Sequence, residues 1–167
     1  VNFIRNGKPV GKTEGFSAQI VAKEAIHWLK EIRNPKKPFV LSVWTHEPHL
    51  PIATDQRFLD LYEPHKNRKY MGNISQLDHA LGMIMKALNE TGEADNTILI
   101  FTSDNGPEGM SHNHGGSTGG LRGRKRDDHE GGIRVPGIIR WPGHIEPATV
   151  SDTPIIGSDI FPTALEV

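Results

Sequence analysis

The stretch Asn-Thr-Ile-Leu-Ile-Phe-Thr at residues 96–102, followed at once by Ser103-Asp104-Asn105-Gly106, decides the fold class of this chain. A short apolar run of this kind, bounded by turn residues, predicts a buried strand. In open α/β sheets, ligands bind beyond the carboxyl ends of the strands. The same stretch therefore also locates a candidate site, in the loop that follows it.

The neighbouring segments alternate between strand and helix patterns. Short β-prone runs bounded by proline or polar loops predict two further strands, at Phe39–Trp44 and Val135–Trp141. Apolar residues at helical spacing predict helices over residues 17–32 and 73–89, and residues 158–167 are expected to form a final helix. This alternation predicts an α/β fold with a mostly parallel sheet flanked by helices.

Residues at the ends of the two longer helices sharpen their predicted limits. Ser17 is a candidate N-cap for the first helix, and Asn34-Pro35 stops its pattern. Gly92 is a candidate C-cap for the second helix. Asp78 lies on the apolar face of that helix, where a buried carboxylate satisfied by a neighbour is favoured over a catalytic role.

Composition bounds the function classes. The 167 residues fit one domain, and 35% hydrophobic residues together with 18 glycines are typical of a globular chain. No apolar run reaches membrane-span length, and 19 basic against 20 acidic residues disfavour a nucleic-acid partner. The absence of cysteine excludes a disulfide scaffold, a thiolate zinc site and a cysteine nucleophile. Because the chain starts at Val1 without a signal-like run, we expect a processing or truncation point there.

The loop Thr45-His46-Glu47-Pro48-His49-Leu50-Pro51 follows the first predicted strand. Two prolines stiffen its backbone and so fix the direction of both imidazoles. A zinc-protease helix needs two histidines four residues apart, whereas these are three apart in a proline-rich loop. A solvated or capping role and a functional role are evenly matched on the loop alone. Its place beside a second polar strand-end loop favours function.

Asp104 and Asn105 offer a carboxylate and an amide oxygen, which are hard ligands suited to Ca²⁺ or Mg²⁺. The alternative is an Asx turn that ends the strand. Calcium takes about six to eight oxygens, so the remaining ligands must come from elsewhere. Downstream, a long Gly-rich segment reaches Gly132 and is expected to be functional or disordered. Its basic run Arg122–Arg126 is balanced by the acidic residues that follow it, which favours a small-anion site over a nucleic-acid patch.

Six motifs in order resemble the type I sulfatases of the alkaline-phosphatase superfamily, particularly the arylsulfatase A and N-acetylgalactosamine-6-sulfatase branch. They are His-Glu-Pro-His-Leu-Pro (46–51), Phe-Thr-Ser-Asp-Asn-Gly-Pro-Glu (101–108), Gly-Gly-Leu-Arg-Gly-Arg-Lys (119–125), Glu-Gly-Gly-Ile-Arg-Val-Pro (130–136), Arg-Trp-Pro-Gly (140–143) and Asp-Ile-Phe-Pro-Thr (159–163). The resemblance implies that residues 1–167 form a single partial domain. That domain would be the C-terminal portion of a sulfatase catalytic domain with a partial alkaline-phosphatase-like fold, whose N-terminal half is missing.

The resemblance also implies roles for five residues. Asp104 and Asn105 correspond to two of the family's Ca²⁺ ligands, and Lys125 corresponds to the lysine that contacts the sulfate and the nucleophile. His49 corresponds to the histidine that hydrogen-bonds the sulfate near the leaving oxygen, and His46 lines the substrate pocket beside it. Related zinc phosphatases and phosphodiesterases typically carry Asp-His in place of Asp104-Asn105, so the asparagine favours a hard-metal sulfatase.

The chain departs from the family in its nucleophile. The family uses a formylglycine made from the first residue of a Cys/Ser-x-Pro/Ala-x-Arg motif, and no cysteine or serine here begins that motif. We therefore expect the longer parent to hydrolyse sulfate esters and this chain alone to be inactive. The alternatives are a phosphodiesterase or phosphonate monoester hydrolase of the same superfamily, and a non-catalytic, truncated sulfatase-like module.

The resemblance extends to partners and location. The expected partner is a sulfate ester, with a sulfated glycan as a plausible class, and neither a nucleic acid nor a membrane is expected to bind. A sheet edge left exposed would permit self-association. A periplasmic, secreted or lysosomal location is expected from the family.

Overall fold

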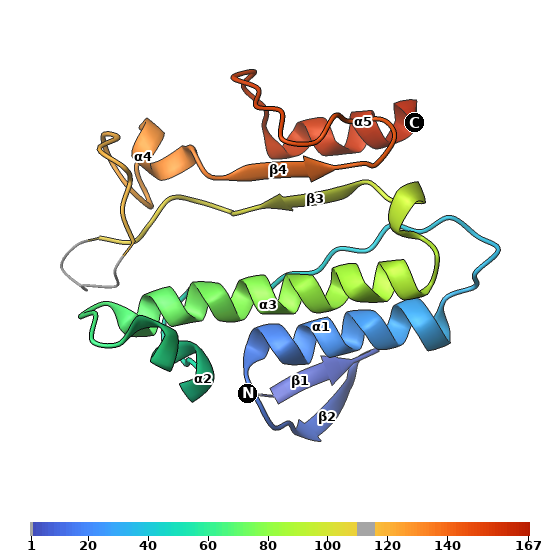
Figure 1. Ribbon diagram of the computed structural model, residues 1–167, viewed down its shortest axis with the longest axis horizontal. Coiled ribbons are helices and arrows are strands. Elements are labelled where there is room, and N and C mark those ends of the chain that lie inside the picture. The colour runs from blue at the N-terminus through green and yellow to red at the C-terminus, as the bar shows by residue number, and fades with distance from the viewer. Residues whose placement is uncertain (1, 110–115) are drawn as a thin grey trace.

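Two helices packed side by side form the centre of the computed structural model, which describes residues 2–109 and 116–167 (Figure 1). They are α1 (Ser17–His27), prolonged by one π-helical turn (Trp28–Ile32), and α3 (Arg68–Glu90). Alanines at their contact allow a close approach, and leucines extend the core toward the C-terminal end of α3. The buried apolar residues form two clusters. One consists of Ala18, Ala22 and Ala80, and the other consists of Leu29, Ala87, Leu88 and Ala94.

Shorter elements surround this pair. Strands β1 (Asn2–Arg5) and β2 (Lys8–Lys12) form an antiparallel hairpin against α1, and β3 (Leu99–Thr102) pairs antiparallel with β4 (Gly137–Arg140). The remaining helices are α2 (Gln56–Leu59), α4 (Glu130–Ile133) and α5 (Ile160–Glu166), with 3₁₀ turns at Asp60–Tyr62, Ala94–Asn96 and Gly157–Asp159. Within the described ranges, no helix is long and apolar enough to cross a membrane.

The predicted helices are confirmed, with changed ends. The helix expected over residues 73–89 begins at Arg68, and Gly92 follows its end at φ 73°, as a helix stop requires. The first helix has Phe16 rather than Ser17 as its N-cap, with no side-chain capping bond. Asp78 is exposed rather than buried. The buried face of α3 runs through Asn73, Gln76 and Ala80, which turns Asp78 toward solvent.

The strand predictions are only partly right. The strands predicted at 96–102 and 135–141 form β3 and β4, but Ile100 and Ile138 are 37% and 56% exposed, so neither strand is buried. The mostly parallel sheet is also wrong for the described residues, where both strand pairs are antiparallel. Residues 39–44 are extended but form no strand, because no strand among the described residues supplies hydrogen bonds to them.

The β1–β2 hairpin was not predicted, although the sequence signals it. Asn6 and Gly7 adopt φ values of 51° and 77°, as a two-residue hairpin turn with positive φ at both positions requires. Asn-Gly between β-prone residues is the usual signal of such a turn. The hairpin lies against α1 at the end of the molecule remote from β3 and β4 (Figure 1).

Candidate functional site

The two predicted histidines lie close together in the 45–52 loop. Both side chains are exposed, and their ring centroids are 5.2 Å apart. His46 Nε2 and His49 Nδ1 both donate to the carbonyl oxygen of Leu50, over 3.1 and 2.7 Å. A carbonyl can only accept, so in the neutral rings His46 carries its proton on Nε2 and His49 on Nδ1. His49 Nε2 is then the ring atom left to meet a ligand.

The predicted metal ligands lie where β3 ends. Asp104 is exposed, and Asn105 is half-buried with its Nδ2 donating to the carbonyl of Gly106 over 2.9 Å. That bond directs the amide nitrogen inward and leaves Asn105 Oδ1 as an acceptor. A carboxylate and an amide oxygen fit a hard cation such as Ca²⁺. In the part of the chain that the structure describes, no group of three His, Asp or Glu residues is arranged to hold a metal, so these two oxygens are a partial set.

Close backbone contacts join the Asp104–Asn105 loop to the segment that carries Lys125. The Lys125 backbone N–H donates to Pro107 O over 3.0 Å, and the Gly106 N–H donates to Gly132 O over 2.8 Å. A Cβ at Gly106 would overlap the carbonyl oxygen of Gly131. Only glycine allows this approach, so the glycines of the sequence after β3 let the segment that carries Lys125 pack against the Asp104–Asn105 loop.

An ion pair that the sequence did not predict also joins these two loops. Arg126 Nη1 donates to Glu108 Oε1 over 2.5 Å, and the Gly109 N–H donates to the same carboxylate. The hydrogen bond from Arg126 is the main cause that lowers the pKa of Glu108 to about 2, followed by the bond from Gly109. The spacing of 18 residues gives no local signal for this pair, which exists only because the two loops meet.

The structure brings together some of the predicted residues and not others. Asp104, Asn105 and Lys125 share one junction, whereas no hydrogen bond among the described residues joins the two histidines to it. The extended segment that leads to the histidines runs in the same direction as β3 and is seen between β3 and α3 before it passes behind α3 (Figure 1). Residues 110–115, part of the predicted long loop, lie outside the described residues.

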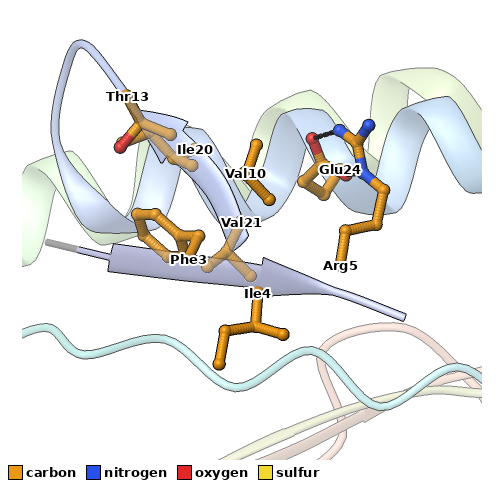
Figure 2. A pocket seen from close by; sticks show the side chains of 8 residues that line it. All are labelled: Phe3, Ile4, Arg5, Val10, Thr13, Ile20, Val21 and Glu24. Atoms are coloured by element: carbon orange, nitrogen blue, oxygen red, sulfur yellow. Dashed lines mark hydrogen bonds and ion pairs between the residues drawn. The ribbon is translucent and has the colours of Figure 1, made fainter. Parts of the chain in front are cut away.

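A hollow on another part of the molecule contains none of these residues. It measures about 230 Å³ and lies between the β1–β2 hairpin and α1, as Figure 2 shows. Its lining is apolar apart from Thr13 and the ion pair between Arg5 and Glu24. It is a packing gap under the hairpin, and the candidate site is instead an open surface at the end of β3.

Comparisons with known proteins identify the family of this chain. The sulfatase family model matches residues 3–167. Arylsulfatase A of Bos taurus is 35% identical over 150 residues, which cover 89% of this chain and 28% of that protein. N-acetylgalactosamine-6-sulfatase of Mus musculus is 32% identical over 95% of this chain and 31% of its own length.

Structural similarity supports the same assignment. The solved structure of Ps i-CgsB in complex with k-i-k-neocarrahexaose has a TM-score of 0.78 and 28% identity, covering 86% of this chain and 32% of that one. The chain thus spans less than a third of the length of each of these three proteins. The predicted class, an α/β chain with part of the alkaline-phosphatase-like sulfatase fold, is confirmed. This chain belongs to the sulfatase family.

Proposed function

We propose that the protein to which this chain belongs hydrolyses sulfate esters, and that this chain supplies part of the metal site and of the sulfate-binding site. The observation that carries the proposal is the junction between the two loops. The backbone bonds from Lys125 to Pro107 and from Gly106 to Gly132 join the segment that carries Lys125 to the loop that carries the two oxygen ligands, which supports an ammonium group acting on the same substrate. A sulfate monoester needs such cationic groups, because negative charge on its oxygens must be offset while the ester bond breaks.

Each residue has a role that its environment supports. Asp104 and Asn105 Oδ1 are the proposed ligands of Ca²⁺, which would offset charge on the nonbridging sulfate oxygens when bound. The Lys125 ammonium binds the same sulfate group. His49 is the proposed donor to the departing oxygen, and because its Nδ1–H is held by Leu50 O, only the protonated ring offers a proton at Nε2.

The nucleophile is proposed to lie outside these 167 residues, as a formylglycine, because the chain contains no cysteine and none of its serines begins the Ser-x-Pro/Ala-x-Arg form of the motif. The 167-residue chain is then expected to show no turnover of an aryl sulfate with added Ca²⁺, whereas the longer protein turns it over. Substantial turnover by the chain alone would contradict this division of the site. Circular dichroism of the chain is the control, since an unfolded chain would be inactive for an unrelated reason.

The substrate class is proposed to be a sulfated glycan. The support is the similarity to N-acetylgalactosamine-6-sulfatase and to a structure solved with k-i-k-neocarrahexaose. His46 is exposed beside His49 and is proposed to line the sugar-binding side of the site. A panel of sulfated and desulfated oligosaccharides, with release of sulfate as the readout, tests the class.

Substitutions in the longer protein test the individual roles. His49→Ala and Lys125→Ala are each expected to lower kcat/KM by about 10²- to 10⁴-fold, the usual range for a lost proton donor or charge-stabilising group. Asp104→Ala is expected to weaken Ca²⁺ binding, measured by calorimetry. Lys86→Ala is the matched control, since that exposed lysine lies on α3 and pairs with Glu90 on the same helix. Activity close to normal in all three site variants would remove the assignment.

A further inference from the structure

Glu47, between the two histidines, turns inward while they face solvent. Its Oε1 accepts from the backbone N–H of Ala18, over 2.9 Å, and from Gln76 Nε2, over 3.2 Å. Ala18 lies in the first turn of α1 and Gln76 lies in α3. One carboxylate oxygen therefore ties the two-histidine loop to both central helices.

The contact with α1 replaces a missing helix cap. The first N–H groups of a helix have no partner within it, and Phe16 at the N-cap position offers no side-chain acceptor. Glu47 supplies that acceptor from 29 residues further along the chain. A carboxylate also interacts favourably with the positive end of the helix.

The contact with α3 belongs to a buried amide network. Gln76 is fully buried, and its Nε2 also donates to Ala53 O over 3.2 Å, while its Oε1 accepts from the Asp55 N–H over 2.9 Å. Asn73, which is 1% exposed, donates to the same Ala53 carbonyl over 3.0 Å. The loop is thus held at Glu47, between the two histidines, and again at Ala53 and Asp55, which follow His49.

These anchors leave a short span between them, in which His49 and Leu50 lie, and His46 directly precedes the first anchor, Glu47. We propose that Glu47 is a positioning residue: by fixing the loop on α1 and α3, it holds both histidine rings on Leu50 O and so sets their opposite tautomers. His49 Nε2 is thereby turned outward as the ligand-facing atom. The consequence for catalysis rests on the proposed function, whereas the tautomers themselves do not.

The hydrogen bonds of Glu47 allow the role of its side-chain shape to be tested separately from the role of its charge. Both accepted bonds use Oε1, and Oε2 is buried with no hydrogen-bond partner among the described residues. Glutamine at this position keeps an oxygen for both bonds, whereas alanine keeps neither. Glu47→Gln should therefore preserve the positions of the histidines, and Glu47→Ala should release them.

The first test uses ring ¹⁵N NMR of the 167-residue chain, at a pH where the imidazoles are neutral. The unsubstituted chain is expected to show His49 as the Nδ1–H tautomer and His46 as the Nε2–H tautomer. Glu47→Gln should keep this pattern, and Glu47→Ala should change it to averaged signals. Glu93→Ala is the matched control, because Glu93 also joins the two central helices, through Arg33, but at their opposite end.

The proposal would be overturned by the other tautomer of His49 in the unsubstituted chain, or by unchanged tautomers in a folded Glu47→Ala chain. If Glu47→Ala does not fold, the unsubstituted chain and Glu47→Gln still decide, since averaged signals in Glu47→Gln with its fold intact also contradict it. In the longer protein, Glu47→Ala should lower kcat for an aryl sulfate by about 10- to 100-fold with little change in KM, as expected for misplacement of a reacting group. Absence of sulfatase activity in the unsubstituted protein would remove the proposed function and leave the tautomer result standing.

Discussion

At the scale of single residues, Glu108 shows how contacts between loops set local chemistry. Its carboxylate accepts from Arg126 and from the Gly109 N–H, and these bonds lower its pKa to about 2. The unfolded chain would titrate this group near its ordinary value, about 4.3. Because the folded pKa is the lower one, folding gains stability from Glu108 above pH ~4.3 and loses it as the pH falls toward 2.

We therefore expect Glu108 to remain ionised in the folded chain throughout mildly acidic conditions. A ¹³C NMR titration of the side-chain carboxyl should give a midpoint near pH 2 for Glu108. Arg126→Ala should move that midpoint back toward the ordinary value of a glutamate, because it removes the largest cause of the shift. Arg134→Ala is the control, since that arginine pairs with Glu130 instead. A Glu108 midpoint that Arg126→Ala does not move would contradict the ion pair.

At the scale of elements, two glycines of α3 lie in opposite surroundings. Gly82 is exposed, and a Cβ there would meet nothing within 4 Å. Gly72 is buried, and a Cβ there would come within 2.7 Å of the backbone oxygen of Phe58 in α2. The same substitution on one helix should thus have effects of opposite sign.

Gly82→Ala is expected to raise the free energy of unfolding by about 1 kcal/mol, the usual gain of alanine over glycine in a helix interior. Gly72→Ala is expected to lower it by about 1–3 kcal/mol, because the added methyl group forces α2 away from α3. Urea unfolding followed by circular dichroism measures both, and each variant is the control for the other. A destabilised Gly82→Ala chain, or a Gly72→Ala chain as stable as the original, would be inconsistent with the packing of these helices.

The elements also differ in how far the sequence could predict them. The helices were predictable because their apolar residues recur locally, as the match of residues 17–32 with α1 and its π-helical turn shows. Strands depend on partners distant in sequence, so the pattern of residues 39–44 could not reveal that they remain unpaired. The candidate site shows the same difference between local features, which the sequence reveals, and contacts between distant residues, which it does not. The sequence offered His46, His49, Asp104, Asn105 and Lys125 as candidates, and their roles stay predictions. The hydrogen bonds by which Glu47 and Gln76 hold the histidine loop could be found only in the fold.

At the scale of the whole molecule, the β elements leave apolar surface uncovered. Val40 and Trp44 are 89% and 87% exposed in the extended 39–44 segment, and Ile138 is 56% exposed on β4. The structure holds two separate two-stranded sheets, and a sheet of this size is rarely stable on its own. Unpaired extended backbone flanked by apolar side chains is a template for another strand.

We therefore expect the 167-residue chain to self-associate through this surface. Sedimentation velocity should show a weight-average mass that rises above 18.5 kDa with concentration. Val40→Lys should reduce the association, because a charge on an unpaired edge opposes strand addition. Val150→Lys is the matched control, since Val150 is 92% exposed in a segment with no strand, and it adds the same charge elsewhere. Equal association of both variants would assign the contact to another surface, and a chain that stays monomeric at all concentrations would show that the exposed segment does not attract a partner strand.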